Sequence, residues 1–325
     1  MPRQARLDAP GALHHIMIRG INKSAIFKDN QDKTRFLERL GEIILEAGCA
    51  VFAWVLMDNH AHILFKSGPK GISGVMRKLL TWYAIYYNRR HRRSGHLFEN
   101  RYKSILCEEE NYLLALVRYI HLNPIRVGIV KTLPELDRYP WSGHSVIMEN
   151  SKYPWMGTNY VLSQFSRTRR AAKTAYRKFI EEGLDMGHRP ELTGGGLIRS
   201  LGGWSQVVSM HRKGHREASD ERVLGSGDFV SAILKEAEER EKRQLRFRQS
   251  GITIAGIMEE ECKSRRISLK ELNSGSRRRK VSQVRAVVAY RGKEELGLSA
   301  AEIARHLGVS TSSITRAIEK MERNK

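Results

Sequence analysis

Long apolar stretches and cysteine are both scarce in this sequence. The longest uninterrupted apolar run is Cys49–Met57, nine residues, whereas a membrane-spanning helix needs roughly 20. The three cysteines are scattered along the chain, so neither a disulfide framework nor a cysteine-based zinc site is indicated. The basic N-terminus, Met1–Arg6, has no apolar segment behind it, and we therefore expect no secretory signal. These features predict a protein of a reducing cytoplasm with no membrane partner.

Acidic residues are also few relative to basic ones. The chain has 57 lysines and arginines against 35 aspartates and glutamates, which gives a formal net charge of +22 at pH 7. Such an excess is typical of proteins that bind polyanions, because each neutralised phosphate releases bound counterions. An anionic membrane surface would attract the same charge, but no segment combines strong basic charge with the amphipathicity of a surface-lying helix. The composition therefore favours a nucleic acid as the partner.

The spacing of apolar residues predicts alternating strands and helices in the first half of the chain. The expected strands are residues 11–20, 49–57, 60–65 and 102–107, and the expected helices are 32–45, 72–87 and 108–122. Asp58 and Asn59 suit a tight hairpin between the second and third strands. The order β-α-β-β-α-β with one further helix predicts an α+β domain with a ferredoxin-like fold over residues 1–148.

The rest of the chain is expected to form two further parts. Residues 149–250 are an accessory basic and helical region, with glycine-rich turns between Gly194 and Gly203 and a charged linking helix at 229–247. Residues 251–325 are helical and basic and carry no strand pattern. An all-α region is therefore predicted to follow the α+β domain.

Two histidines lie two positions apart on the strand predicted at residues 60–65. Side chains alternate along a strand, so His60 and His62 share one face, while the residues next to them point to the other face and can enter the core. Two imidazoles on one sheet face can bind one metal ion side by side. Without further context, such a pair is more often two exposed histidines on a half-buried strand.

The third predicted helix carries a tyrosine and an asparagine on one side. Tyr119 and Asn123 are four positions apart and so share a helix face, although Pro124 biases Asn123 away from helical geometry. Beside the histidine pair, Asn123 could supply an oxygen ligand, and mixed imidazole and oxygen ligation suits Mg²⁺ or Mn²⁺. The metal would polarise a phosphodiester for attack by the Tyr119 oxygen. Taken alone, Tyr119 is more often a packing residue.

Three segments, in order, carry a resemblance to a known family. They are Met57–Leu64 (MDNHAHIL), Gly95–Tyr102 (GHLFENRY) and Arg118–Arg126 (RYIHLNPIR). Over about residues 5–148 the chain resembles the single-tyrosine HUH transposases, in the branch associated with repetitive extragenic palindromes. The resemblance implies that His60 and His62 are metal ligands, that Asn123 is the third ligand and that Tyr119 is the nucleophile. Residues 220–225 (DERVLG) also resemble longer members of that branch.

The resemblance also implies the reaction and the substrate. Enzymes of this family nick and rejoin single-stranded DNA beside hairpins, through a 5′-phosphotyrosine intermediate and a free 3′-OH. The covalent bond keeps the phosphodiester energy, so no ATP is needed. Two alternatives stay open, namely a DNA-binding regulator that does not cleave and a metal-dependent nuclease that uses water. The presence of all four site residues argues against the regulator.

Basic residues gather at the end of the helix predicted at 72–87. The arginines available for DNA contact are Arg89, Arg90, Arg92 and Arg93. They follow two tyrosines, and phosphate contacts combined with aromatic stacking suit single-stranded DNA. A solvated basic helix end, favoured by the helix dipole, explains the same residues equally well. The high net charge favours contact with DNA.

Residues 298–321 have the pattern of a helix-turn-helix. Ala304 precedes Gly308 by four positions, and this pairing of a small residue with a turn glycine lets two helices cross closely. Residues 310–321 are then the recognition helix. The side chains that it would offer to a DNA major groove are Ser312, Ser313, Thr315 and Arg316. A helical hairpin used only for packing is the alternative.

Residues 251–322 resemble the C-terminal DNA-binding domain of the replication initiator DnaA, mainly over residues 267–281 and 284–286. At the turn, Ser310–Ser313 replaces the Asp-His-Ser-Thr block of that family. The resemblance therefore implies the fold and not the same DNA site, and the lack of a phosphate-binding P-loop gives no support for initiator function. The sequence as a whole predicts a cytoplasmic, nucleoid-associated protein, monomeric or homodimeric, that cuts hairpin DNA and holds duplex DNA.

Overall fold

The computed structural model describes residues 7–69, 71–186, 192, 220–249 and 251–323. The chain forms two compact units, residues 1–233 and 234–325, and the boundaries expected at residues 148 and 250 remain predictions. The glycine-rich turns expected between Gly194 and Gly203 lie outside the described residues. Within the described ranges, none of the helices combines the length and the apolar character needed to cross a lipid bilayer.

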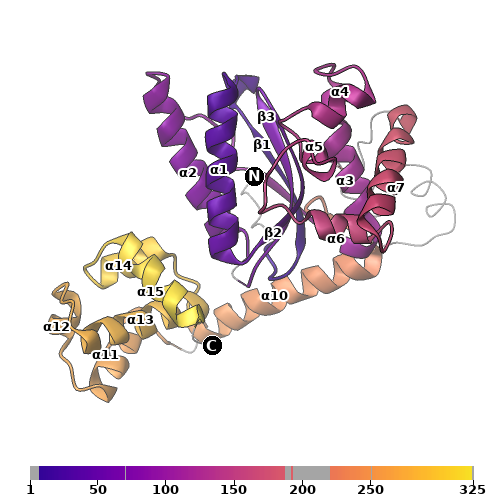
Figure 1. Ribbon diagram of the computed structural model, residues 1–325. Coiled ribbons are helices and arrows are strands. Elements are labelled where there is room, and N and C mark those ends of the chain that lie inside the picture. The colour runs from indigo at the N-terminus through magenta and orange to yellow at the C-terminus, as the bar shows by residue number, and fades with distance from the viewer. Residues whose placement is uncertain (1–6, 70, 187–191, 193–219, 250, 324–325) are drawn as a thin grey trace. The chain divides into compact units, whose positions relative to one another are not determined.

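A five-stranded sheet forms the centre of the N-terminal unit (Figure 1). Four of its strands are β1 (Leu13–Arg19), β2 (Ala50–Met57), β3 (His60–Lys66) and β4 (Lys103–Cys107). The order across the sheet is β2-β3-β1-β4-β5, and the pairs β2–β3, β3–β1 and β1–β4 are antiparallel. Met57 pairs with His60 across the predicted hairpin. The α+β fold expected from the sequence is confirmed.

The fifth strand, β5 (Val223–Leu224), comes from a distant part of the chain and pairs parallel with β4. Its position is fixed at both ends. Leu106 N donates to Arg222 O over 2.8 Å, and the amide and hydroxyl of Ser226 donate to the Glu108 carboxylate over 2.9 and 3.0 Å. The segment at residues 220–226 therefore belongs to the sheet of the N-terminal unit.

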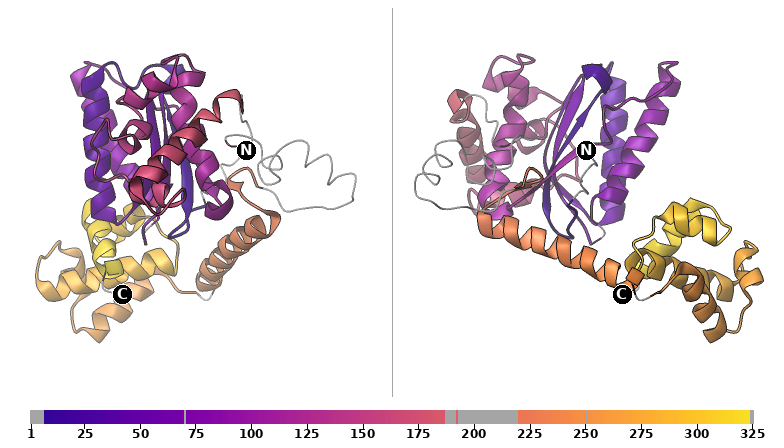
Figure 2. Two further views of the ribbon diagram at one scale, coloured as in Figure 1. Left: turned by 45° about the vertical axis from the view of Figure 1, so that its right-hand side comes forward. Right: turned by 180° about the vertical axis from the view of Figure 1, so that it is seen from behind.

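Helices cover both faces of this sheet (Figures 1 and 2). On one face lie α1 (Asn30–Ala47) and α2 (Ser73–Arg90), which pack against each other. Asp29 caps the start of α1, where its side chain accepts from Asp32 N over 3.0 Å, and Gly48 caps the end in the left-handed conformation. Its apolar side is fully buried against the sheet, as its helical spacing predicts.

The opposite face is covered by the remaining helices of the unit. They are α3 (Glu109–Arg126), α4 (Leu133–Arg138), α5 (Gly143–Ile147), α6 (Thr158–Ser163) and α7 (Arg169–Glu181). Helix α3 lies on β2 and β3, whereas α4 and α7 pack against α3 from outside. The sheet is thus the middle of three layers, and α3 is the helix nearest to the predicted histidine pair.

Helix α3 continues to Arg126 instead of ending at residue 122 as expected. Pro124 lies inside it and cannot donate the hydrogen bond that would normally reach Ile120 O. The Asn123 side chain compensates, because its Nδ2 donates to Ile120 O over 3.4 Å and to Tyr119 O over 3.1 Å. Tyr119 and Asn123 therefore remain in one continuous helix.

A buried chain of hydrogen bonds joins α3 to α5 and α7. Nδ1 of His121 and Nδ1 of His144 each lie 2.8 Å from the Tyr176 hydroxyl, and His144 Nε2 lies 2.8 Å from Asp137. Burial opposes ionisation of Asp137, but bonds from His144 and Arg177 lower its pKa, so it accepts the His144 Nε2 proton. Tyr176 then donates to His144 and accepts from His121. This order satisfies every group of the chain except His121 Nε2, which has no hydrogen-bond partner.

The C-terminal unit is helical throughout its described part. Helix α10 (Gly227–Gln249) spans the division between the units and is followed by α11 (Ile254–Ser264), α12 (Leu269–Asn273), α13 (Arg279–Glu294), α14 (Ala300–His306) and α15 (Thr311–Arg323). Gly308 joins α14 to α15 with φ of +62°, and a Cβ there would lie 2.9 Å from Asn273 O. Both the backbone angle and the lack of space therefore require glycine.

We expect Tyr176→Phe to lower the free energy of unfolding of the N-terminal unit by about 1–3 kcal/mol, because two buried imidazoles lose their common partner. Tyr160→Phe is the matched control, since its hydroxyl bonds Glu109 on the exposed surface. All five tryptophans precede residue 233, so tryptophan fluorescence during urea unfolding reports this unit within the full chain. Equal losses in the two variants would contradict a structural role for the buried chain.

Stability should also fall as the pH is lowered from 7 to 5. Burial lowers the pKa of His121 and His144, and that of His14 to about 4, whereas unfolded histidines titrate near 6.5. The unfolded state therefore takes up these protons first, so stability present above pH 6.5 is lost as the pH approaches 4. Each such histidine contributes up to about 1.4 kcal/mol per pH unit. In urea unfolding, the free energy of unfolding of His14→Leu should depend less steeply on pH than that of the original protein. An unchanged dependence would refute the contribution of His14.

Candidate active site

Strands β1 and β3 place three histidines on the sheet face that α3 covers. Their register pairs Arg19 with His60 and Met17 with His62, and directly opposed residues of antiparallel strands point to the same face. His15, two positions before Met17, therefore lies diagonally across from His62. The ring centroids of His60 and His62 are 5.3 Å apart, and those of His15 and His62 are 5.2 Å apart.

His60 has a defined tautomer. Asn59 Nδ2 donates to Lys23 O over 3.1 Å, which fixes the orientation of the Asn59 carboxamide. Its Oδ1 lies 2.6 Å from His60 Nδ1 and can only accept. His60 therefore carries its proton on Nδ1, and its Nε2 is the atom with a lone pair.

His62 reaches the same tautomer through His15. His15 Nδ1 lies 3.3 Å from Leu192 O, a carbonyl that can only accept, so this nitrogen carries the proton. The Nε2 of a neutral His15 must then accept from His62 Nδ1, which is 2.9 Å away. His62 is therefore protonated on Nδ1 as well. Both members of the predicted pair present an Nε2 lone pair.

Both imidazoles are held in the neutral form. Burial, together with the charge of Arg19, lowers the pKa of His60 to about 4. Burial, His15 and His60 lower the pKa of His62 well below its usual value. A neutral imidazole is the form that binds a metal ion. Arg19 itself is exposed and adds positive charge at the edge of the pair, where a phosphate could approach.

Tyr119 lies directly over this cluster. Its ring centroid is 6.0 Å from that of His62 and 5.9 Å from that of His15, with edge-to-face geometry in both cases. The side chain is 6% exposed. The Arg126 guanidinium lies 5.2 Å from the centre of the ring, and its Nη1 donates to Tyr119 O over 3.2 Å. The fold thus brings the predicted nucleophile and the predicted metal pair together.

Asn123 lies on the same helix, and both of its hydrogen bonds to α3 use the amide nitrogen. Its Oδ1 is consequently the atom that could bind a metal. Within the part of the chain that the structure describes, no group of three or more His, Cys, Asp or Glu side chains is arranged to hold a metal ion. Ligands beyond the two histidines would have to be amide, phosphate or water oxygens.

The predicted DNA-contacting arginines at the end of α2 differ in their surroundings. Arg90 forms ion pairs with Asp29 at 2.7 Å and Asp32 at 2.5 Å. Arg93 donates to Asn88 Oδ1 and to His96 O. Arg89 and Arg92 are exposed and are the two best suited to meet a phosphate. DNA contact by this group remains a prediction.

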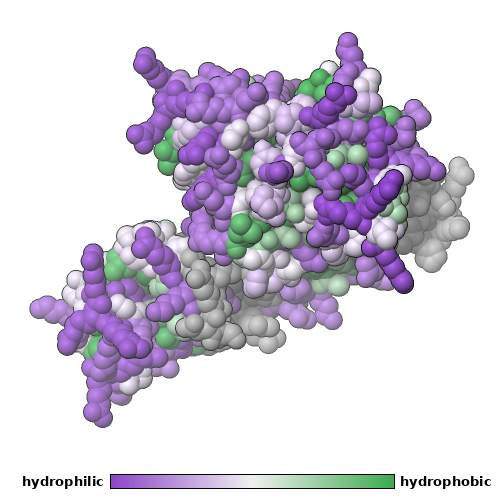
Figure 3. Space-filling model, in the orientation of Figure 1, coloured by the Kyte–Doolittle hydropathy of each residue, from purple (hydrophilic) through white to green (hydrophobic). Residues whose placement is uncertain are grey.

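On α15, the side chains predicted for a major groove are largely at the surface. Ser312, Ser313 and Arg316 are exposed, whereas Thr315 is half-buried and donates to Thr311 O over 3.0 Å. Both units present a mostly hydrophilic surface in Figure 3. Recognition of duplex DNA by these residues remains a prediction.

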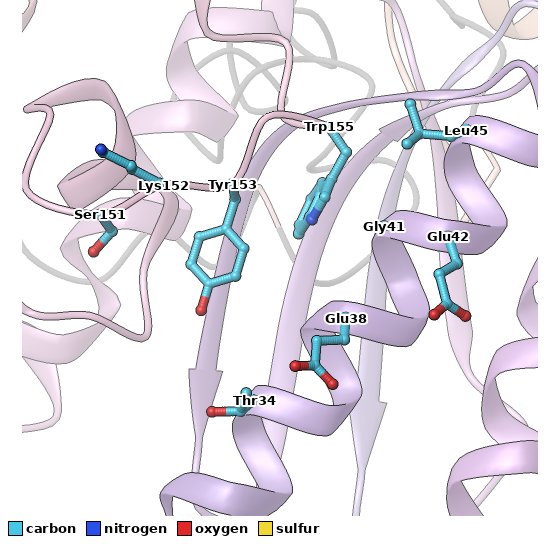
Figure 4. A pocket seen from close by; sticks show the side chains of 9 residues that line it. All are labelled: Thr34, Glu38, Gly41, Glu42, Leu45, Ser151, Lys152, Tyr153 and Trp155. Atoms are coloured by element: carbon cyan, nitrogen blue, oxygen red, sulfur yellow. The ribbon is translucent and has the colours of Figure 1, made fainter.

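A separate hollow of about 650 Å³ lies between α1 and residues 151–155 (Figure 4). Trp155 packs over Gly41, where a Cβ would lie 2.3 Å from the indole ring. Glu38 and Glu42 line the hollow, which makes it unsuited to a phosphate. None of the predicted site residues lines it, so the candidate site is the histidine cluster under α3.

One protein family matches the part of the chain that contains this cluster. Residues 10–123 match the family model described as "Transposase IS200 like". This part of the chain is similar to IS200-like transposases. The match runs from β1 to Asn123 and includes both histidines of the pair and Tyr119. It supports a transposase-type function, in which DNA is cleaved and rejoined.

A solved structure of a REP-associated tyrosine transposase bound to a REP hairpin also matches the chain. The identity is 14% and the TM-score 0.38, over 48% of this chain and 97% of that chain. No curated protein sequence matches. The family match ends within α3, so it does not extend to the C-terminal unit.

Proposed function

We propose that the N-terminal unit nicks and rejoins single-stranded DNA beside a hairpin, with Tyr119 as the nucleophile. The observation that supports this most directly is the 6.0 Å separation between the ring centroids of Tyr119 and His62. A phenol therefore lies next to His62, whose ring centroid is 5.3 Å from that of His60, and the Nδ1 atoms of both imidazoles are already hydrogen-bonded. That combination suits attack on a phosphodiester held at the two Nε2 atoms through a metal.

The residues fit a divalent metal, and we propose Mg²⁺ or Mn²⁺. His60 and His62 would bind it through Nε2, and Asn123 through Oδ1, leaving positions for phosphate and water oxygens. When bound, the metal would polarise the scissile phosphate and stabilise its developing charge. Arg19, exposed opposite His60, would hold a neighbouring phosphate.

In the proposed reaction the Tyr119 oxygen loses its proton and attacks phosphorus. A new oxygen–phosphorus bond forms as the bond to the 3′ oxygen breaks; the Tyr119 proton passes to water and the leaving 3′ oxygen takes up a proton from water, which gives a 5′-phosphotyrosine and a 3′-OH. The Arg126 guanidinium, 5.2 Å from the centre of the ring, places positive charge beside the attacking group. The reverse attack, by a 3′-OH on the phosphotyrosine, rejoins DNA.

Tyr119→Phe should abolish covalent attachment of DNA, because the attacking oxygen is removed while the ring and its packing remain. The measurement is a denaturing gel of full-length protein with labelled single-stranded hairpin oligonucleotides from the flanks of its gene, with Mn²⁺ or chelator. Tyr160→Phe is the matched control and should still give the metal-dependent protein–DNA band. Persistence of that band in Tyr119→Phe would exclude this nucleophile. Tight duplex binding without any band would favour a regulator.

We further propose that the C-terminal unit binds duplex DNA through α15. Arg316 is exposed on this helix, and an arginine that contacts a base edge contributes about 1–3 kcal/mol to recognition.

Arg316→Ala should therefore weaken duplex binding about 10-fold or more in a gel-shift titration, without reducing covalent attachment to the hairpin. Arg265→Ala, which removes the same charge from an arginine paired with Glu261, controls for net charge. Equal weakening in both variants would show that α15 is not the recognition helix.

A further inference from the structure

The imidazole of His15 lies beneath the candidate site and has no role in the proposed chemistry. It is fully buried, so it does not meet a substrate from solvent. Its two ring nitrogens are nevertheless both engaged, Nδ1 with Leu192 O at 3.3 Å and Nε2 with His62 Nδ1 at 2.9 Å. Its ring edge also contacts Tyr119, with centroids 5.9 Å apart. One buried side chain therefore touches both the proposed metal ligand and the proposed nucleophile.

We propose that His15 is a positioning residue that holds His62 in the tautomer and orientation required to bind metal. The inference rests on the proposed function, in which His62 is a ligand. A neutral imidazole can carry its proton on either nitrogen, and only the form protonated on Nδ1 offers Nε2 to a metal. His15 Nε2 is an acceptor placed to select that form. Such partners of metal-binding histidines typically contribute 10- to 100-fold to affinity.

The chain of donors and acceptors has a fixed direction, and this direction supports the assignment. It starts at Leu192 O, which can only accept, so His15 donates from Nδ1 and, as a neutral imidazole, accepts at Nε2. A donor in place of that carbonyl would let His15 carry its proton on Nε2 and donate it to His62 Nδ1. The His62 proton would then lie on Nε2, the nitrogen that should bind the metal. Asn59 performs the equivalent task for His60 through its Oδ1, at 2.6 Å.

The neighbouring His14 provides an internal comparison. Side chains alternate along β1, so His14 points to the opposite face of the sheet, where Nδ1 lies 3.2 Å from Ser104 Oγ. Its Nε2 is buried and has no hydrogen-bond partner. The two adjacent histidines are thus equally buried, but only His15 is directed to the candidate site.

The test is a titration of the full-length protein with Mn²⁺ alone, in which free Mn²⁺ is measured by electron paramagnetic resonance. His15→Leu removes the acceptor and should weaken Mn²⁺ binding about 10- to 100-fold. His15→Gln keeps a carboxamide acceptor near the Nε2 position and should remain within a few-fold of the original protein. His14→Leu removes an equally buried imidazole from the other face and should leave the affinity unchanged. Unfolding followed by tryptophan fluorescence identifies any variant that has lost its fold.

The outcomes separate this inference from the proposed function. If His62→Ala weakens Mn²⁺ binding and a folded His15→Leu does not, the positioning role is refuted and the metal site stands. If His62→Ala has no effect, the metal site and the positioning role both fail.

A second measurement needs no variant of His15. Long-range ¹H–¹⁵N spectra of protein labelled at histidine should show the His62 resonance, assigned by its loss in His62→Ala, with the proton on Nδ1. A proton on Nε2 in the metal-free protein would overturn the proposal even if His15→Leu failed to fold.

Discussion

The pairing of β1 with β3 is the interaction on which the candidate site depends. It sets Arg19 opposite His60 and Met17 opposite His62, and it places His15 within hydrogen-bond distance of His62. A slip of one residue would turn His15 to the other face of the sheet and replace it with His14. The opposite face of the sheet fixes this register, because the alternate residues of both strands are fully buried there, on the side covered by α1 and α2. The apolar core on one face therefore determines the polar geometry on the other.

Helix α3 supplies the other half of the site and is held by two different means. Near its C-terminal end the Asn123 side chain replaces the hydrogen bond that Pro124 removes, so Tyr119 keeps a helical backbone close to a proline. On its outer side His121 belongs to the buried chain that includes Tyr176 and His144. Rotation of α3 would break that chain and carry Tyr119 away from His62. Helices α5 and α7, which carry His144 and Tyr176, thus contribute to the position of Tyr119 through α3.

Most of the fold was predictable because alternation and helical spacing are local properties of sequence. The strands, the hairpin after Met57 and the face shared by His60 and His62 all follow from patterns a few residues long. What could not be predicted depends on contacts between distant segments. His15 is placed beside His62 only by the strand register. The two-residue strand β5 is too short to show a pattern of its own. Arg90 pairs with Asp29 and Asp32, which lie about 60 positions away in the sequence. In the same way, the pattern around Pro124 predicted an early helix end because it could not include compensation by the side chain of Asn123.

Charge and burial act together at the candidate site. A net charge of +22 favours binding of phosphates, and nearby positive charge also opposes protonation of a histidine. At His60 the nearby Arg19 adds to the effect of burial, and at His62 burial is reinforced by the neighbouring imidazoles. Because both rings are already neutral, metal binding would release no proton from them and would compete little with acidification. The positive surroundings that would draw DNA to this site also keep its two imidazoles in the form that could bind a metal.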